Sequence, residues 1–442
     1  MKDCSPSFVP PDPEIFVSLR TLPGIRHPRF HDLAQPDAVT MPTISTAPVP
    51  VIYEDESTMI HLTVTGRCYA QCKGCINSAF TLSSDTPRNL LTTVQECDPE
   101  RDVSIILNLI QNNRKKRVTV CFYGGEPFLA ADKMDQVRQL LARSGAGDQV
   151  RYMVYTNGEL LIEGVNAYPD LMAAIWLYSV SIDGDEEQHS RVRPGTSVEK
   201  ITRNLRRFRD HYRNQVLFWS TLREEQSLWN CFEEFMNLHR DGLVDHFFWH
   251  WAETREPFQD LAGFADRYGR ELERVMDSYV HELSQGNLLS IVHINELILY
   301  LATGKERGHT ACGVELAKNF DISEGKVFAC VDLPPSLSLG EVEADGRLRF
   351  RERELQSLVL YKDWLGCSEC GVQPYCGGRC PVQALAGSPE RTLQYCQLMR
   401  LHVGIVQERM DAIRSGLARH NISLQTLYDR SAFLAKYTDV VP

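Results

Sequence analysis

The sequence of 442 residues contains no apolar run long enough to cross a lipid bilayer. Its longest run, from Leu171 to Val180, has about half of the roughly 20 residues that a transmembrane helix needs. The first residues, MKDCSPSFVPPDPE, lack the apolar core of a secretion signal. We therefore expect no membrane contact and take the cytoplasm as the default compartment.

Positive charge is also scarce. The chain has 47 Lys and Arg against 58 Asp and Glu, which gives a formal net charge of −11 at pH 7. This excess of negative charge disfavours nonspecific binding to nucleic acid and to anionic lipid, although it allows a local basic patch. We expect no nucleic-acid partner.

Proline is unevenly spread, and no internal repeat is visible. Ten of the 22 prolines fall within the first 50 residues. Because proline fixes φ and removes a backbone donor, we expect residues 1–58 to be an irregular N-terminal segment.

From residue 59, segments with a strand pattern alternate with segments that have helical apolar spacing. Such alternation is typical of parallel strands joined by right-handed crossovers. Six units of this kind could form a doubly wound sheet or an open barrel, and in both the chemistry belongs at the carboxyl ends of the strands. The six expected strands are 59–65, 117–124, 149–156, 175–183, 215–222 and 245–252.

Cysteine is abundant, and most of it is clustered. In a reducing compartment, 14 cysteines are better interpreted as metal ligands or catalytic thiols than as disulfides. The scattered ones, which we interpret as structural, are Cys4, Cys97, Cys121 and Cys231. The clustered ones are Cys68, Cys72 and Cys75 after the first strand, and Cys312, Cys330, Cys367, Cys370, Cys376, Cys380 and Cys396 near the C-terminus.

The loop after the first strand has one thiol too few for a closed metal site. Three thiolates leave a tetrahedral zinc incomplete, and they leave one iron of a four-iron cluster without a protein ligand. Taken alone, Cys72 and Cys75 could instead form a thioredoxin-like redox pair.

Polar residues follow the next three strands, so we expect them on the same rim as this loop. Gly124 and Gly125 allow a ligand to approach the backbone. The Glu126 carboxylate suits an amino group, and Arg193 suits a carboxylate. Asn157, Ser181 and Asp183 could bind a sugar or a zwitterion. The implied ligand is an amino acid attached to a nucleoside.

Cys68-X3-Cys72-X2-Cys75 together with Gly-Gly-Glu-Pro resembles the radical S-adenosylmethionine (AdoMet) enzymes, and SIDGDEEQHSRVRPG resembles their peptide- and protein-modifying branch. The resemblance implies an incomplete (β/α)6 barrel over residues 59–300. It also implies a [4Fe–4S] cluster on the three cysteines, whose open iron binds AdoMet. The AdoMet contacts that it implies are Gly124, Gly125, Glu126, Pro127, Asn157, Ser181, Asp183 and Arg193.

One residue of the loop departs from this pattern. Many relatives have an aromatic residue just before the last cysteine, where it can lie against the adenine. Gly74 stands at that position in this chain. The adenine must therefore find another wall or a backbone contact.

The seven C-terminal cysteines resemble those of the SPASM extension. We expect this domain over residues 301–400 and a helical tail over 401–442. Taken alone, the cysteines from 367 to 396 would also suit a zinc ribbon. The resemblance implies two auxiliary [4Fe–4S] clusters, three clusters in all. The first would lack a fourth cysteine, so its last iron is open or is bound by His309 or a distant residue. The ligands would be Cys312, Cys330 and Cys380 for the first, and Cys367, Cys370, Cys376 and Cys396 for the second.

We expect a maturase that abstracts hydrogen from a ribosomally made precursor peptide and installs a thioether, ether or carbon–carbon crosslink. The alternatives are a sulfatase-type maturase, which forms formylglycine, and a non-catalytic iron–sulfur electron carrier. Sulfatase maturases resemble one another in an Asp that serves as the base directly after the cysteine equivalent to Cys330. Here Val331 intervenes before Asp332, our candidate base, and Asp321 and Glu315 are the alternatives. The expected partners are the peptide and a reductant such as flavodoxin or ferredoxin. A leader would be bound by a separate protein or by the barrel's own surface, unless the peptide has none.

Overall fold

The computed structural model describes residues 57–78, 96–112, 117–316, 319–330, 332, 338–343, 348–350, 355–438 and 441–442. Almost all of the expected N-terminal segment 1–58 lies outside these residues, as do Cys4 and Val331. In the part of the chain that is described, the search for a helix that could span a membrane finds none.

Six parallel strands form the centre of the fold and pair in chain order. Their bounds agree with the six expected strands to within two residues at each end, which confirms the α/β class. They are β1 (Ser57–Thr65), β2 (Arg117–Gly124), β3 (Val150–Thr156), β4 (Ile175–Ser181), β5 (Gln215–Leu222) and β6 (His246–Trp251).

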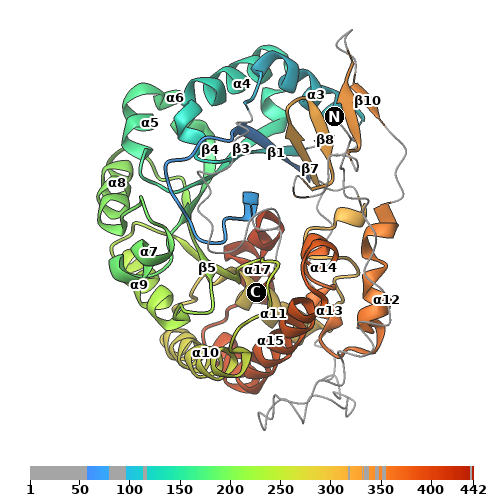
Figure 1. Cartoon of the computed structure of the whole chain (residues 1–442). Helices are drawn as coiled ribbons and strands as arrows, with labels where there is room; N and C mark the ends of the chain where they lie inside the picture. Colours follow the sequence, from blue (N-terminus) through green and yellow to red (C-terminus); the bar gives the residue numbers. More distant parts are fainter. Residues whose placement is uncertain are drawn as a thin grey trace.

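Helices run around the outside of these strands (Figure 1). Residues 161–174 form two helices, because Pro169 cannot donate a backbone hydrogen bond and so begins a new helix. The helices are α3 (Pro99–Asn112), α4 (Ala131–Arg143), α5 (Leu161–Ala167), α6 (Pro169–Ala174), α7 (Glu186–Val192), α8 (Val198–His211), α9 (Leu228–Arg240) and α10 (Leu261–Ser284).

The C-terminal region extends the same sheet. Strand β7 (Asn319–Ser323) pairs in parallel with β1, and β8 (Lys326–Phe328), β9 (Gly340–Val342) and β10 (Leu348–Phe350) add to it antiparallel. The helices here are α11 (Val292–Thr303), α12 (Tyr361–Leu365), α13 (Gln373–Cys376), α14 (Pro381–Ala386), α15 (Pro389–Glu408), α16 (Met410–Arg419) and α17 (Leu424–Arg430), before the 3-10 turn η9 (Ala432–Tyr437).

The expected domain boundaries at 300 and 400 fall inside helices. α11 spans the first, and α15 spans the second while packing against α10 of the barrel. Because a packed helix cannot be divided between independent units, the barrel, the cysteine-rich region and the tail share elements.

The inside of the barrel is closed at one end by the C-terminal segment. Leu434 and Tyr437 of η9 pack against one inward-facing residue from each strand, and the Tyr155 hydroxyl donates to the Tyr437 carbonyl at 2.6 Å. Figure 1 shows the C-terminus near the centre of the ring. The inward-facing residues are Met59, Cys121, Met153, Leu177, Leu217 and Phe248. This apolar plug leaves the carboxyl end of the strands for polar residues.

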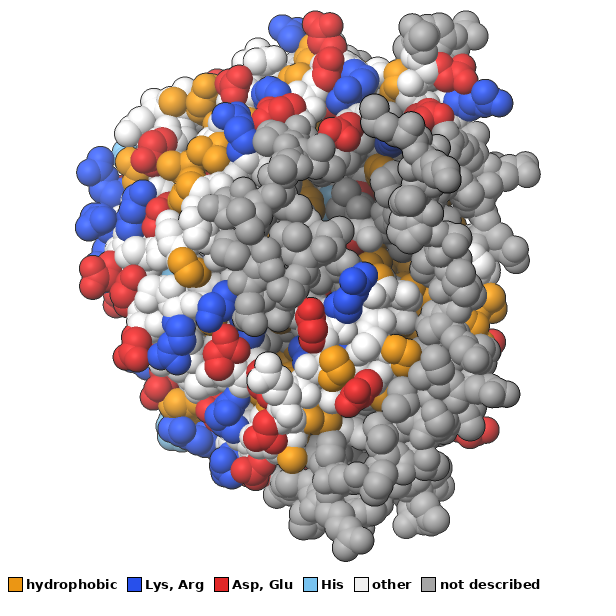
Figure 2. Space-filling view, in the orientation of Figure 1, with side chains coloured by type: hydrophobic (Ala, Val, Ile, Leu, Met, Phe, Trp, Pro, Cys, Tyr) orange, Lys and Arg blue, Asp and Glu red, His pale blue; other side chains and the backbone are white. Residues whose placement is uncertain are grey.

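Acidic and basic side chains are interspersed over the described part of the face seen in Figure 2. On that part no single-signed patch stands out, in keeping with the modest net charge.

Candidate functional site

The three-thiol loop leaves β1 at Thr65 and lies across the carboxyl end of the barrel. Its cysteines, Cys68, Cys72 and Cys75, are half-buried and form no disulfide. Backbone hydrogen bonds from Gln71 to Pro194 (2.8 Å) and from Lys73 to Val192 (2.9 Å) fix the loop against the end of α7. The structure therefore holds the thiols beside the strand-4 segment that the sequence singled out.

Gly125 is required by the close approach of this loop. A Cβ at Gly125 would lie 2.0 Å from the Arg67 carbonyl oxygen, which no side chain tolerates. The amides of Gly125 and Glu126 donate to the carbonyls of Thr65 (2.7 Å) and Arg67 (2.9 Å). Gly125 thus allows the cysteine loop to pack against the end of β2. From the sequence we had expected the two glycines to let a ligand approach the backbone, which is a different role.

Glu126 links the ends of β2 and β3. Its buried carboxylate accepts from the Thr156 hydroxyl (2.8 Å) and from the amides of Asn157 (2.8 Å) and Phe128 (3.1 Å). Burial raises the pKa of Glu126 to about 7, although these hydrogen bonds oppose the shift. Pro127 begins a 3-10 turn, η3 (Pro127–Ala130), which Glu126 caps.

Asn157 presents an unpaired donor beside Glu126. Its Oδ1 accepts from the Tyr69 hydroxyl at 2.8 Å, whereas its buried Nδ2 has no hydrogen-bond partner among the described residues. An unpaired buried amide is costly, so a ligand that accepts from Nδ2 would be stabilising. Ser181, the last residue of β4, is half-buried.

Asp183 and Arg193 bind each other in a buried ionic network. Arg193 Nε donates to Asp183 Oδ2 at 2.6 Å, and Arg223 donates to the same oxygen at 3.0 Å. Burial by itself would raise the pKa of Asp183, but the charges of Arg193 and Arg223 outweigh it and lower the pKa to about 2. Arg193 NH1 also lies 3.9 Å from Cys72 Sγ.

The sequence analysis missed Arg223 and Thr221. Both lie at the carboxyl end of β5, and the Thr221 amide donates to Asp183 at 2.9 Å. Polar residues had been collected at the ends of the first four strands only. The same rule applied to the fifth strand would have found them.

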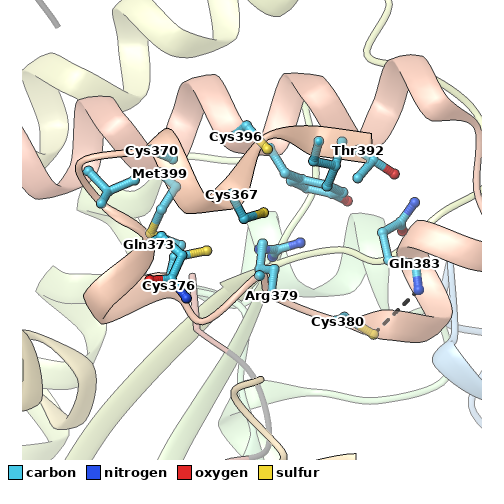
Figure 3. A pocket seen from close by; sticks show the side chains of 14 residues that line it. Cys367, Cys370, Gln373, Cys376, Arg379, Cys380, Gln383, Thr392, Cys396 and Met399 are labelled. Carbon is cyan, nitrogen blue, oxygen red and sulfur yellow. Dashed lines mark hydrogen bonds between the residues drawn. The ribbon is translucent and has the colours of Figure 1, made fainter. Parts of the chain in front are cut away.

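Five of the C-terminal thiols line one apolar pocket, and four of them lie close together (Figure 3). In Figure 3, Cys367, Cys370 and Cys376 lie near Cys396, whereas Cys380 lies apart beside Gln383. Burial and then the neighbouring thiols raise the pKa of Cys396 and of Cys367, which a bound cation would offset.

The other three thiols form a second group. Burial raises the pKa of Cys330 well above its usual value, and Cys380 and Cys312 are among the charges that add to it. Tyr361 is within electrostatic range of thiols from both groups. These neighbours are consistent with the two sets of thiols that the SPASM resemblance implies, and the assignment of cluster ligands stays a prediction.

His309, one of the alternatives for the fourth ligand, directs its Nδ1 to the Thr310 carbonyl at 2.6 Å, and the Thr310 hydroxyl lies 3.8 Å from Cys312 Sγ. Across the described residues, no three His, Cys, Asp or Glu side chains form a group suited to a single metal ion.

Five aromatic residues stand two positions further along their strands than the inward-facing residues that meet the plug, and four of them are only half-buried. Ring contacts of 5.2 to 6.2 Å connect His61, Tyr123, Tyr155, Trp219 and His250 across the strands. We call the part of the barrel interior that these rings line the aromatic chamber. It adjoins the three-thiol loop, because the carbonyl of Gly124, next to Tyr123, accepts from Asn77 at 2.9 Å.

Asp332 lies at this chamber near His61 and Asp321. The sequence analysis did not predict that these three side chains come together. His61 Nδ1 and Asp321 Oδ1 are 2.7 Å apart on paired strands. Burial and the charge of Asp321 raise the pKa of Asp332 to about 7, whereas His61 lowers it. Despite the one-residue offset, Asp332 Oδ2 stays 4.0 Å from Cys330 Sγ and within electrostatic range of Tyr123.

The structure is an open parallel barrel with a three-thiol loop and a set of polar groups at the carboxyl ends of its strands. Residues 62–226 match the Radical SAM superfamily, so the chain contains a radical SAM domain. This family implies a [4Fe–4S] cluster and AdoMet, and the half-buried thiols with the unpaired Asn157 amide fit both. No curated protein matches the chain significantly in sequence.

Solved structures share the fold at low identity. Polyhistidine-tagged anSMEcpe with bound AdoMet, an anaerobic sulfatase maturase, superimposes with a TM-score of 0.63 and 16% identity, over 85% of this chain and 98% of that one. Native anSMEcpe with bound AdoMet and the Cp18Cys peptide superimposes with a TM-score of 0.59 and 16% identity, over 82% of this chain and 99% of that one. Streptococcus suis SuiB bound to S-adenosylmethionine aligns with a TM-score of 0.43 and 14% identity, over 73% of this chain and 70% of that one. The cysteine-rich C-terminal region is consistent with a SPASM domain.

Proposed function

We propose that the protein is a radical AdoMet maturase that oxidises a peptide and crosslinks two of its residues. The carrying observation is the aromatic chamber, because contacts connect it to both regions. Tyr123 precedes Gly124, whose carbonyl accepts from Asn77 beside the three-thiol loop at 2.9 Å, and the Tyr123 ring lies 5.7 Å from His61, which pairs with Asp321 of the C-terminal region at 2.7 Å. A substrate residue in this chamber would be near the site of radical formation and near an electron acceptor. A structure of the same fold that holds AdoMet together with a peptide supports this proposal.

The cluster held by Cys68, Cys72 and Cys75 would supply the electron that cleaves AdoMet to methionine and a 5′-deoxyadenosyl radical. Within the protein, Glu126 would hold the amino group of AdoMet, and Asn157 Nδ2 would donate to an oxygen or ring nitrogen acceptor of AdoMet. Gly124, Gly125 and Pro127 would shape the edge of the pocket. Ser181, Asp183 and Arg193 would bound the opposite side and orient the ligand.

The two C-terminal thiol groups would each hold an auxiliary [4Fe–4S] cluster. Cys330 lies 4.0 Å from the Asp332 carboxylate, so the group of Cys312, Cys330 and Cys380 would accept the surplus electron of the substrate. Asp332 would take the substrate proton, since its raised pKa of about 7 suits a general base at neutral pH. A reductant such as flavodoxin or ferredoxin would supply the first electron, and a separate protein would present the leader.

A sulfatase-type maturase is the second candidate. The observation in its favour is the position of Asp332 beside Cys330, which the one-residue offset does not remove from the chamber. The product would then be formylglycine, made from a single Cys or Ser.

Anaerobic reconstitution tests the proposal. With dithionite and AdoMet, the protein should form 5′-deoxyadenosine and bind three clusters, about twelve irons. Synthetic peptides that carry Cys, Ser or aromatic residues are then added and analysed by mass spectrometry. A crosslink removes two hydrogen atoms without creating a hydrazide-reactive aldehyde, whereas formylglycine reacts with hydrazide. Absence of 5′-deoxyadenosine would sink both candidates and favour an electron carrier.

A further inference from the structure

Arg223 connects three parts of the molecule that meet at the three-thiol loop. Its Nε donates to the Lys73 carbonyl at 2.7 Å, across 150 residues of sequence. Its NH1 donates to Asp183 at 3.0 Å and to the Thr221 carbonyl at 3.0 Å. Since Lys73 lies between two cysteines, Arg223 ties the cysteine loop to the ends of β4 and β5.

The loop leaves room for this side chain at Gly74. Gly74 has a φ of +56°, and a Cβ there would lie 4.0 Å from Arg223 Nε and 3.7 Å from Thr254 Cγ2. A large side chain at this position would compete with the guanidinium for the same space. Gly74 and Arg223 therefore form one local arrangement.

The buried network around Arg223 has one positive charge in excess. The single carboxylate of Asp183 faces two guanidiniums, and all three side chains are at most 12% exposed. His189, which contacts Asp183, adds no charge at neutral pH, because burial lowers its pKa to about 4. An uncompensated buried charge is expensive, so the network favours an anionic group beside it.

The cysteine loop lies beside this excess charge. Arg193 NH1 is 3.9 Å from Cys72 Sγ, and Arg223 Nε donates to the carbonyl of Lys73, the residue that follows Cys72. The reduction potential of an iron–sulfur cluster depends on nearby charge, because reduction adds one negative charge to the cluster. A buried cation beside Cys72 therefore favours the reduced state.

We propose that Arg223 is a positioning residue that fixes the cysteine loop through Lys73 and makes reduction of the cluster on that loop easier. The inference rests on the proposed function, because it requires a cluster on Cys68, Cys72 and Cys75. It goes beyond that function by assigning the control of electron entry to a side chain at the end of β5.

The test is a redox titration of the full-length reconstituted protein, followed by electron paramagnetic resonance. The signal that changes when AdoMet is added belongs to the loop cluster. Arg223→Gln should disfavour reduction of this cluster at least tenfold. For a one-electron couple, a tenfold change lowers the midpoint potential by about 59 mV. Arg223→Lys keeps the charge and should retain most of the wild-type potential, with weaker AdoMet binding because the loop is less well fixed.

Arg209→Gln is the matched control. Arg209 is also largely buried and pairs with a carboxylate, Asp245, at 2.7 Å, but it lies at the amino end of the barrel. Its substitution should leave the midpoint unchanged.

Three outcomes would overturn the inference or its basis. An unchanged midpoint in Arg223→Gln, with wild-type iron content, would refute a role of Arg223 in reduction. An equal shift in Arg223→Lys would show that charge is not the cause. If the wild-type protein has no AdoMet-sensitive signal, the proposed function itself fails. Loss of the signal in Arg223→Gln with its retention in Arg223→Lys would support the positioning role.

Discussion

The three-thiol loop and the four-thiol pocket place the same ligand atoms in different surroundings. Around the loop are two guanidiniums and an unpaired amide. The pocket also has a guanidinium at one thiol, since Arg400 lies 3.7 Å from Cys370 Sγ, but its walls are largely apolar and include Leu365, Val372, Tyr395 and Met399. Polar surroundings suit a site that must admit a zwitterion, and apolar surroundings enclose a site and exclude water. The contrast suggests that one site is built for chemistry and the other for electron storage.

The largest effect should come from removing one thiol in each place. Cys72→Ala should abolish AdoMet cleavage and lose about four irons, because only two thiolates would remain for the cluster. Cys396→Ala should also lose about four irons but still cleave AdoMet. Iron analysis and chromatography of 5′-deoxyadenosine measure both. If Cys396→Ala loses cleavage while remaining folded, the division between the two sites is wrong.

The next effect concerns the buried ion pairs of the two regions. Asp183→Asn leaves two buried guanidiniums without a counter-charge and should lower the free energy of unfolding by about 3–5 kcal/mol. Glu296→Gln, in the pair with Arg307, should cost less, because Arg307 keeps the Tyr375 carbonyl and two aromatic contacts. Urea unfolding of both variants measures the difference.

The pH dependence of the two pairs should have opposite signs. The pKa of Asp183 is lowered to about 2, so its stabilisation is present above about pH 4 and disappears as the pH falls towards 2. Burial raises the pKa of Glu296, so wild-type stability should fall as the pH rises above about 4.5. If both variants cost equally at every pH, this distinction fails.

Glu126 predicts how AdoMet binding depends on pH. With a pKa of about 7, its carboxyl is largely neutral below that pH and cannot pair with an ammonium group. AdoMet affinity should therefore fall up to about tenfold per pH unit between about pH 7 and 5. Equilibrium dialysis measures it. Glu126→Gln should bind more weakly and show no such slope; a slope that persists in this variant must come from another group.

The barrel was predictable because each strand carries its own apolar pattern and each motif follows a strand end. Local sequence thus sufficed to place Cys68, Glu126 and Asp183 on one rim. What it could not supply are contacts between distant segments. Arg223 reaches Lys73 across 150 residues, and the Tyr437 plug reaches Tyr155 across 282. No periodicity records such pairs, since each depends on how the finished barrel closes.

The smallest effect tests whether the two regions form one packed body. Gly269 lies within α10, and a Cβ there would meet Leu401 of α15 at 3.5 Å, an ordinary contact. Gly269→Ala should raise the free energy of unfolding by about 0.5–1 kcal/mol, because alanine restricts the unfolded chain and favours helix. Gly416→Ala is the matched control, since its Cβ would lie 2.8 Å from Leu283 and should not stabilise. If Gly269→Ala destabilises the protein, α10 and α15 lie closer together than described. The barrel and the cysteine-rich region would then be packed more tightly against each other than the contrast between their thiol sites implies.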